Sequence, residues 1–283
     1  MPLVTTREML REAQIGGYAV CAFNAENMEM VQAIVSAAVE LSSPVIIQTT
    51  PSTLRYAGPD YFRAIAEAAV SVASVPVALH LDHGDSFALA CQAIRAGYTS
   101  VMIDGSKRPF AENVSITAKV AELARALSIP VEGELGCVGG KEDDMEAGGG
   151  GYTDPGEAAL FVSQTGVDSL AVGIGTVHGF YAEKPVLDID RLSAIRKLVD
   201  VPLVLHGATG LSDETIIECI RRGICKVNFA TELRAAFTGA VRATLSQDSA
   251  IVDVKTYGMA ARQAVKELAM RKIAISGSAA KSI

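Results

Sequence analysis

The stretch VALHLDHGDSFALACQAIRAGYTSVMIDGS, residues 77–106, contains the unit that decides the fold of this chain. Its first segment, Val77–His80, is short and apolar and predicts a β-strand, whereas Phe87–Ala96 has apolar residues at helical spacing. A second apolar segment, Ser100–Ile103, predicts another strand. A strand, a helix and a strand in this order are typical of a parallel sheet with helices outside it.

The same alternation continues in both directions along the chain. Six further strands are predicted at Ala19–Phe23, Val45–Gln48, Val131–Leu135, Ser169–Val172, Leu203–His206 and Lys226–Asn228. Six further helices are predicted at Glu29–Leu41, Tyr61–Val72, Asn113–Leu127, Pro155–Gln164, Ile189–Leu198 and Asp213–Arg222. Eight is the number of strands that closes a (β/α)8 TIM barrel, and we therefore predict an α/β fold of this type.

An open, doubly wound sheet is the competing architecture. It favours a glycine-rich dinucleotide turn after the first strand, but Asn24–Asn27 follows that strand and contains no glycine. No linker divides the chain, so residues 1–283 are expected to form a single barrel domain. From about Glu232 the sequence predicts extra C-terminal helices, packed on the barrel or on a neighbouring subunit. Ser276–Ile283 is expected to form a loose tail.

The composition of this 283-residue chain argues against several classes of function. With 49% hydrophobic and 20% charged residues, it is typical of a globular protein. A net charge of −7 without a basic run argues against nucleic-acid binding, and no apolar run is long enough to cross a membrane. The N-terminus lacks a signal-peptide pattern, and the five cysteines form no CxxC pair. We therefore expect reduced thiols in a cytoplasmic protein.

Only four histidines occur in the chain, and each lies at or just beyond the C-terminal end of a predicted strand. Barrel enzymes carry their chemistry on that rim. His83, His178 and His206 are expected to converge there and to bind zinc, since three neutral imidazoles leave the ion an open coordination position. His80 lies within its strand and is assigned to structure or to support of the site.

Carboxylates crowd the same rim. Asp82 is next to His83 and can reach a metal-bound substrate, so a functional role is favoured. Asp104 ends the fourth strand, and Glu132 and Glu134 alternate in the fifth, so that both glutamates should face the same side. For Asp104 and Glu134, a structural role in ion pairs or hydrogen bonds explains their presence at the rim as well as a direct role in the reaction does.

Three rim segments have the composition of ligand-binding loops. Gly136–Thr153 is glycine-rich and acidic and predicts a mobile lid that carries Glu142 or Asp143 into the site. The alternative for this segment is a solvated, flexible loop. His206–Gly210 and Asn228–Thr231 combine small residues with the start of a helix, and together they predict phosphate binding by backbone amides.

Seven long motifs point to a known family. In chain order they are GGYAVCAFNAEN (16–27), HLDHG (80–84), SVMIDGS (100–106), VEGELGCVGGKEDD (131–144), LAVGIGTVHGFY (170–181), PLVLHGATGL (202–211) and GICKVNFATEL (223–233). On these motifs, nearly the whole chain resembles the class II, metal-dependent ketose-bisphosphate aldolases, most closely the tagatose-bisphosphate branch.

The resemblance implies an aldehyde-lyase that uses Zn2+. Its expected reaction is the reversible cleavage of tagatose-1,6-bisphosphate or fructose-1,6-bisphosphate to dihydroxyacetone phosphate and an aldehyde such as glyceraldehyde 3-phosphate. Matching positions assign proton transfer to Asp82 and Glu142, zinc ligation to His83, His178 and His206, a second or alternate metal site to Asp104 and Glu134, and substrate contacts to Asn24, Gly179, Gly207, Ala208, Thr209, Asn228, Phe229, Ala230 and Thr231. The resemblance also implies a monovalent cation such as Na+ near the phosphate and a homodimer or homotetramer.

Departures from the family pattern leave the identity of the sugar substrate open. Gly84 stands where many tagatose-type members carry a second histidine, and Thr209 replaces a common serine. The usual Asp-Pro-Arg segment is absent, and residues 252–255 stand in its place. A modified phosphoketose is therefore an alternative substrate.

Three other functions compete with this one. A Schiff-base aldolase would use Lys226, in the eighth strand. A non-catalytic partner subunit would stabilise an aldolase, but it would have no need of the metal ligands. A metal-dependent hydrolase would more often show a His-x-His pair on an early strand, and the sequence has none.

Overall fold

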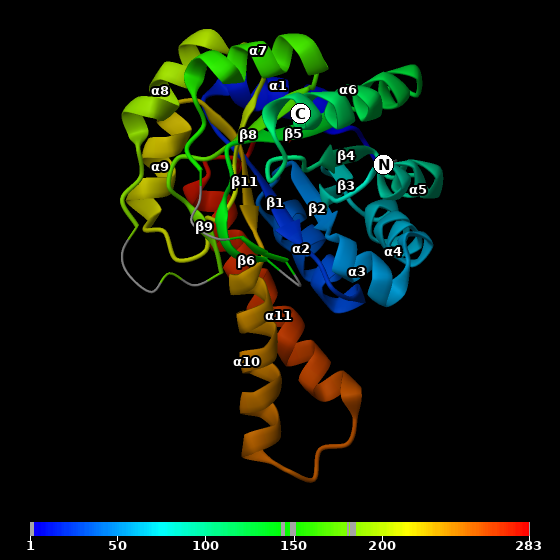
Figure 1. Cartoon of the computed structure of the whole chain (residues 1–283). Coiled ribbons are helices and arrows are strands. Elements are labelled where there is room, and N and C mark those ends of the chain that lie inside the picture. The colour runs from blue at the N-terminus through cyan, green and yellow to red at the C-terminus, as the bar shows by residue number, and fades with distance from the viewer. Residues whose placement is uncertain (1–2, 143–144, 148–150, 180, 182–184, 283) are drawn as a thin grey trace.

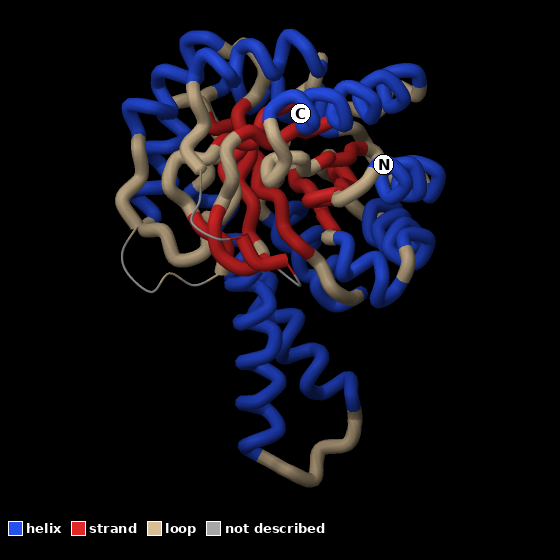
Figure 2. The backbone as a smooth tube through the Cα atoms, in the orientation of Figure 1, coloured by secondary structure: helices blue, strands red, loops and turns tan. Residues whose placement is uncertain are grey.

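The computed structural model describes residues 3–142, 145–147, 151–179, 181 and 185–282. Eight parallel strands form a closed barrel at its centre (Figures 1 and 2), in the order β1-β11-β10-β8-β5-β4-β3-β2. They are β1 Val20–Asn24, β2 Val45–Thr49, β3 Val77–Gly84, β4 Ser100–Ile103, β5 Val131–Leu135, β8 Ser169–Val172, β10 Leu203–Leu205 and β11 Ile224–Phe229. The prediction of an α/β fold with a (β/α)8 barrel is confirmed.

Helices that follow the strands cover the outside of the barrel, as Figure 2 shows. They are α2 Met28–Glu40, α3 Pro51–Ala57, α4 Pro59–Ser71, α5 Phe87–Ala96, α6 Phe110–Ala126, α7 Pro155–Thr165, α8 Ile189–Leu198 and α9 Asp213–Arg221. Side-chain oxygens of Asn27, Ser86, Asp154, Asp188 and Ser212 accept hydrogen bonds from backbone amides in the first turns of five of them. Such caps explain why these helices begin where they do.

Two apolar layers stabilise the barrel. The larger lies between the strands and the outer helices and contains Phe62, Phe161 and Ile195. The smaller contains Leu10 of α1 (Thr6–Gly16) together with Val20, at the start of β1. Helix α1 therefore closes the base of the barrel, and the opposite rim, where the strands end, is left for a site.

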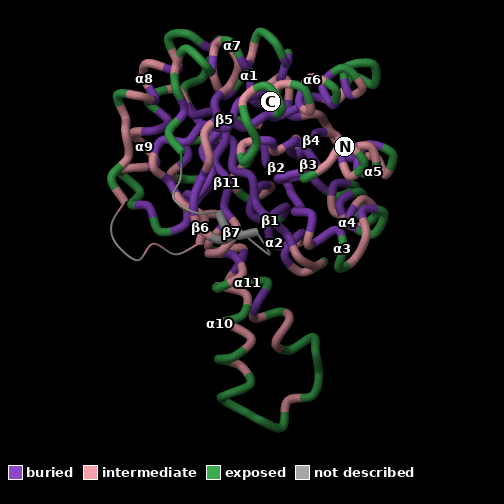
Figure 3. The backbone as a smooth tube through the Cα atoms, in the orientation of Figure 1, coloured by how far each residue is buried: buried purple, intermediate pink, exposed green. Residues whose placement is uncertain are grey.

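Two C-terminal helices, α10 (Thr231–Gln247) and α11 (Val254–Ile275), form a hairpin whose far end projects from the barrel (Figure 1). Figure 3 shows that the projecting end is exposed, in contrast to the barrel strands. The second half of α11 packs against α2 and buries Val265, Ala269 and Ile273. The predicted C-terminal helices are therefore present and lie partly on the barrel.

The residues after α11 are ordered against the barrel, so the prediction of a loose tail is wrong. Ser276 O accepts a hydrogen bond from Ala19 N at 3.0 Å. Ala280 N donates to Leu41 O at 2.8 Å, and Ser282 N donates to Ser42 O at 2.9 Å. These partners lie more than 230 residues away in the chain, and the composition of the tail alone does not reveal them.

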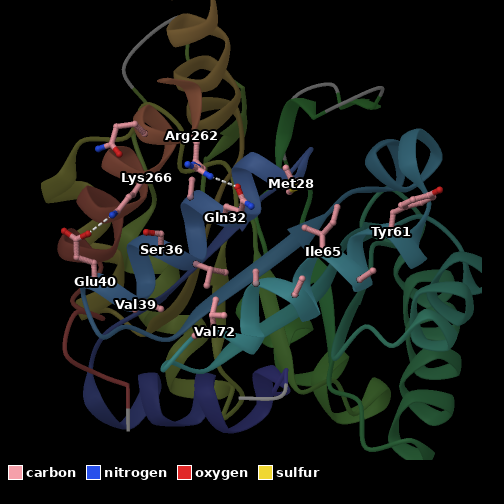
Figure 4. Close-up of a pocket in the computed structure, with 17 residues that line it drawn as sticks. Met28, Gln32, Ser36, Val39, Glu40, Tyr61, Ile65, Val72, Arg262 and Lys266 are labelled. Carbon is pink, nitrogen blue, oxygen red and sulfur yellow. Dashed lines mark hydrogen bonds and ion pairs between the residues drawn. The ribbon is translucent and has the colours of Figure 1, made fainter. Parts of the chain in front are cut away.

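A groove of about 940 Å³ lies between α2, α4 and α11. In Figure 4, Arg262 of α11 reaches Gln32 of α2, with 2.8 Å between Nη1 and Oε1. Lys266 pairs with Glu40 at 2.6 Å in the same groove. The groove belongs to the outer helical layer, so it is separate from the rim where the strands end.

None of the described helices combines the length and the apolar character that a bilayer crossing requires. All five cysteines are free thiols, and three of them, Cys21, Cys219 and Cys225, are buried.

Candidate active site

Asp82 lies in β3 at the rim and is fully buried. Three side-chain amides donate hydrogen bonds to its carboxylate: Asn24 Nδ2 to Oδ2 at 2.8 Å, Gln48 Nε2 to Oδ2 at 3.1 Å and Asn228 Nδ2 to Oδ1 at 3.0 Å. The amides come from β1, β2 and β11, which are neighbours in the barrel. Because amides are neutral, they orient the carboxylate without cancelling its negative charge.

Adjacent residues Asp82 and His83 both take part in buried polar contacts at the rim. In a regular strand their side chains would point to opposite faces. The pairing of β3 with β4 shifts register between Leu81 and Gly84, and His83 has a φ of 47°, in the left-handed region. The predicted strand ended at His80 and did not include this irregularity, because it arises from pairing with β4.

The structure brings His83, His178 and His206 together. One ring nitrogen from each lies within 4.8 Å of the other two. The His83 ring lies between the other two, with centroid distances of 5.1 Å to His178 and 4.6 Å to His206. Each histidine comes from a different element. His83 lies in β3 of the barrel, His206 directly follows β10 of the barrel, and His178 lies in β9 (Val177–His178), which belongs to a separate three-stranded sheet with β6 and β7.

Hydrogen bonds on the far side of two rings fix which nitrogen faces the cluster. His83 Nδ1 lies 2.9 Å from Asp104 Oδ2, and His206 Nε2 lies 2.9 Å from Glu132 Oε1. Each carboxylate therefore accepts a ring N–H, and the other nitrogens, His83 Nε2 and His206 Nδ1, carry lone pairs. These two nitrogens are 2.8 Å apart. At this distance one ring can donate a hydrogen bond to the other when it carries a proton there. In the unprotonated state both nitrogens, together with one from His178, are donors for a metal ion.

Burial and partners set the charge of the surrounding carboxyl groups. Burial raises the pKa of Glu132, but Lys226 and the His206 hydrogen bond outweigh it and hold the pKa below its usual range. Burial also raises the pKa of Asp104, yet its contacts with His83 leave a lowered pKa. Burial and the Asp104 charge raise the pKa of Glu134 well above its usual value. Glu132 and Asp104 are thus the ionised acceptors for the two histidines.

A second possible donor set shares His83. A nitrogen of His83 and carboxylate oxygens of Asp104 and Glu134 lie within 4.8 Å of one another. Glu134 Oε2 is buried and accepts no hydrogen bond from the described residues. The two carboxylates that the sequence placed at this rim are therefore next to the three histidines.

Gly207 lies in the turn after β10 and contacts β9 closely. Its φ is 67°, and a Cβ atom there would lie 2.6 Å from the carbonyl oxygen of Val177. The Tyr181 hydroxyl joins the same two segments, since it donates to Gly207 O at 2.7 Å and accepts from Val177 N at 3.1 Å. Sequence reasoning did not single out Tyr181. The turn therefore lies directly beside the residue before His178.

Gly207→Ala is expected to displace this turn and β9. An alanine meets both an unfavourable φ and the Val177 carbonyl, so we expect a loss of about 1–3 kcal/mol in the free energy of unfolding. Urea denaturation of the two proteins measures the difference. Gly239→Ala is the matched control, because an added Cβ there meets nothing within 4 Å and should stabilise α10 slightly. Equal stability of Gly207→Ala and wild type would contradict the close contact.

Helix α10 begins directly after β11, at Thr231, and no side chain caps its first turn. The N-terminus of a helix at the rim suits an anion. Gly210 N, in the neighbouring turn, instead donates to Glu232 Oε1 at 3.0 Å. The turn after β10 and the start of α10 are thus linked through Glu232, next to the histidine cluster.

A family model for the class-II fructose-bisphosphate aldolases matches residues 4–281. The chain belongs to that family. Among solved structures, the aldolase resembles the YdjI aldolase from Escherichia coli K12, with 37% identity, a TM-score of 0.87, and coverage of 99% of this chain and 100% of the other. It is also similar to a candidate fructose-1,6-bisphosphate aldolase from Coccidioides immitis, with 29% identity, a TM-score of 0.88, and coverage of 97% and 96%.

A fructose-bisphosphate aldolase from Campylobacter jejuni is 21% identical, with a TM-score of 0.84 and coverage of 99% of this chain and 97% of the other. At that identity the likeness shows the shared fold. Membership of the family makes this protein a lyase, and the hypotheses of a non-catalytic subunit and of a hydrolase are not supported.

The predicted lid segment, residues 136–153, contains two short strands in its described part, β6 (Gly139–Glu142) and β7 (Met145–Ala147). Gly140 pairs with His178 of β9, and a Cβ atom at Gly140 would collide with the His178 backbone. The segment is therefore joined to the strand that carries one of the three histidines. The Glu142 side chain and Asp143 lie outside the described residues.

Proposed function

We propose that this aldolase reversibly cleaves a phosphorylated ketose to dihydroxyacetone phosphate and an aldehyde such as glyceraldehyde 3-phosphate, with Zn2+ bound by His83, His178 and His206. The observation that carries the proposal is the group of three imidazoles, in which one ring nitrogen from each histidine lies within 4.8 Å of the other two. Nitrogen donors and a three-residue set are typical of catalytic zinc sites. A bound zinc ion supplies a Lewis acid for the ketose carbonyl.

Asp82 is the proposed general base. In cleavage its carboxylate takes the proton from the C4 hydroxyl as the C3–C4 bond breaks, and in condensation it returns that proton to the aldehyde oxygen. The amides of Asn24, Gln48 and Asn228 hold both carboxylate oxygens, so the acceptor is fixed before substrate arrives. Glu142, on the lid segment, is proposed to exchange the proton at the triose carbon.

The phosphate of the triose half is proposed to bind to backbone amides. The turn from Gly207 to Thr209, Gly179, and the segment from Asn228 to Thr231 supply them, with a monovalent cation such as Na+ as a further partner. A net charge of −7 means that the anion is held by these local groups and not by the overall field of the protein. Asp104 and Glu134 are proposed to hold an alternate metal position with His83.

Lys226 is poorly placed for a Schiff base. Its ammonium is fully buried and lies 2.7 Å from Glu132 Oε2. An imine requires a neutral amine that can attack a carbonyl, and an ion-paired ammonium inside the barrel meets neither condition. Borohydride in the presence of substrate should therefore trap no adduct.

Cleavage rates on tagatose-1,6-bisphosphate and fructose-1,6-bisphosphate, with and without a chelator, test the proposed function. We expect cleavage of at least one of them, loss of that cleavage with the chelator, and its return on addition of zinc. Full activity of the chelated, metal-free protein would contradict the zinc-dependent mechanism. Inactivity on both sugars in the presence of zinc would instead point to a modified phosphoketose.

A further inference from the structure

A buried group of charged and polar residues lies inside the barrel below the three histidines. It consists of His80 of β3, Glu132 of β5 and Lys226 of β11, each no more than 1% exposed. The proposed reaction uses none of them directly. Strands β11 and β5 are separated by β10 and β8, so the Lys226–Glu132 ion pair crosses the barrel interior.

Both oxygens of the Glu132 carboxylate have separate partners. Oε2 accepts from Lys226 Nζ at 2.7 Å, and Oε1 accepts from His206 Nε2 at 2.9 Å. His80 Nε2 is a competing neighbour of Oε2, at 3.8 Å, but it is too far for a hydrogen bond. Lys226 therefore fixes the rotation of the carboxylate, and that rotation keeps Oε1 on His206.

Stability alone does not explain this arrangement. An ion pair in a fully buried position is expensive to desolvate, and well-packed apolar residues in its place are often equally stable or more stable. A carboxylate that accepts the second N–H of a metal-ligating histidine, in contrast, fixes the tautomer and the orientation of the ring. Glu132 accepts the N–H of His206 in this way, and Lys226 in turn donates to the Glu132 carboxylate and holds it in place.

We propose that Lys226 is a positioning residue: it holds Oε2 of Glu132, so that Oε1 keeps the proton on His206 Nε2 and His206 Nδ1 faces the metal position. The inference rests on the zinc site of the proposed function. Lys226 touches neither the substrate nor the metal in this role. Loss of its ammonium leaves the Glu132 carboxylate free to rotate toward His80. Oε1 then no longer holds the proton on His206 Nε2, and the preference for one His206 tautomer is lost.

Lys226→Met tests the proposal in the metal-free protein and during zinc binding. Competition with a chromophoric chelator should show zinc affinity about 10–100-fold weaker than in wild type, the usual effect of losing outer support of a ligand. Nitrogen-15 NMR of the histidine rings in the metal-free protein gives a readout independent of activity. We expect one His206 tautomer, with the proton on Nε2, in wild type and a mixture in Lys226→Met.

Glu132→Gln provides a second, shape-conserving variant. The double variant combines Lys226→Met with Glu132→Gln. If Lys226 acts through Glu132, this variant should bind zinc about as weakly as Glu132→Gln alone, because the two changes interrupt the same contact. Additive losses would show that Lys226 acts by another route and would overturn the proposal.

Lys266→Met is the control, because it removes an ion-paired lysine far from the rim. Lys266 Nζ lies 2.6 Å from Glu40 Oε2, in the groove between α2, α4 and α11. Its loss should leave zinc affinity within about twofold of wild type, as for independent sites. An equal loss in Lys266→Met and Lys226→Met would show a general effect of removing an ion-paired lysine and would overturn the proposal.

Two outcomes separate this inference from the proposed function. The inference alone is overturned if wild type binds zinc and Lys226→Met folds, binds zinc with equal affinity and keeps the same His206 tautomer. Wild type that binds no zinc overturns the metal site and the inference with it. Should Lys226→Met fail to fold, Glu132→Gln decides: unchanged zinc affinity and tautomer overturn the proposal, and weaker binding with a changed tautomer supports it.

Discussion

Asp82→Asn is expected to lower kcat for ketose cleavage by about 10²–10⁴-fold, the usual contribution of a positioned general base. The substitution keeps the size of the side chain but removes the acceptor of the C4 hydroxyl proton. It also places an amide NH2 group among the three amide donors that surround the carboxylate. Substrate contacts elsewhere persist, so we expect the loss in kcat and not in KM.

Steady-state kinetics with the zinc-loaded protein measure this effect. Asp85→Asn is the matched control, since it removes the same charge three residues later from an exposed side chain that lies 4.0 Å from Arg55. It should change kcat by about twofold or less. Asp82→Asn with kcat near the wild-type value would exclude Asp82 as the base.

His206→Ala is expected to abolish zinc binding at the site and to lower cleavage by about 10³-fold or more. Polarisation by a bound metal is worth several kcal/mol, and each ~1.4 kcal/mol is a tenfold change in rate. The substitution removes one of the two nitrogens that face each other and leaves Glu132 without its imidazole partner. Metal analysis after dialysis, together with the cleavage rate, measures both consequences.

His80→Gln is the control for His206→Ala. His80 is equally buried, but its Nδ1 lies 2.8 Å from Ser100 Oγ and it does not belong to the cluster of three. The variant should retain one zinc per chain. A His206→Ala protein that keeps both its zinc and its activity would refute the proposed ligand set.

Much of the barrel could be predicted because its strands are short, apolar and bounded by breaks in pattern. Ser100–Ile103, Val131–Leu135 and Ser169–Val172 were predicted with the bounds that the structure shows. Alternation is a local property of the chain, and such local signals are visible in the residues themselves. The grouping of three histidines followed from the same pattern, because parallel strands in a barrel end at one rim.

The remaining features depend on contacts between distant segments. Gln48 is one polar residue at the end of an apolar strand, and its role appears only when β3 brings Asp82 beside it. From the sequence, Lys226 was considered as a nucleophile. Its ion-pair partner, Glu132, is 94 residues away in sequence, so the sequence alone did not reveal the pair. The partner of the lid segment, β9, is only two residues long and gives no periodic signal.

The register shift at the end of β3 has a consequence for protein engineering. A designer who copies HLDHG onto a regularly paired strand of another barrel would obtain His80 and Asp82 on one face and His83 on the other. The acid and the metal ligand would then be separated by the strand itself. Transfer of this site to another barrel requires the irregular pairing with β4 as well as the HLDHG sequence.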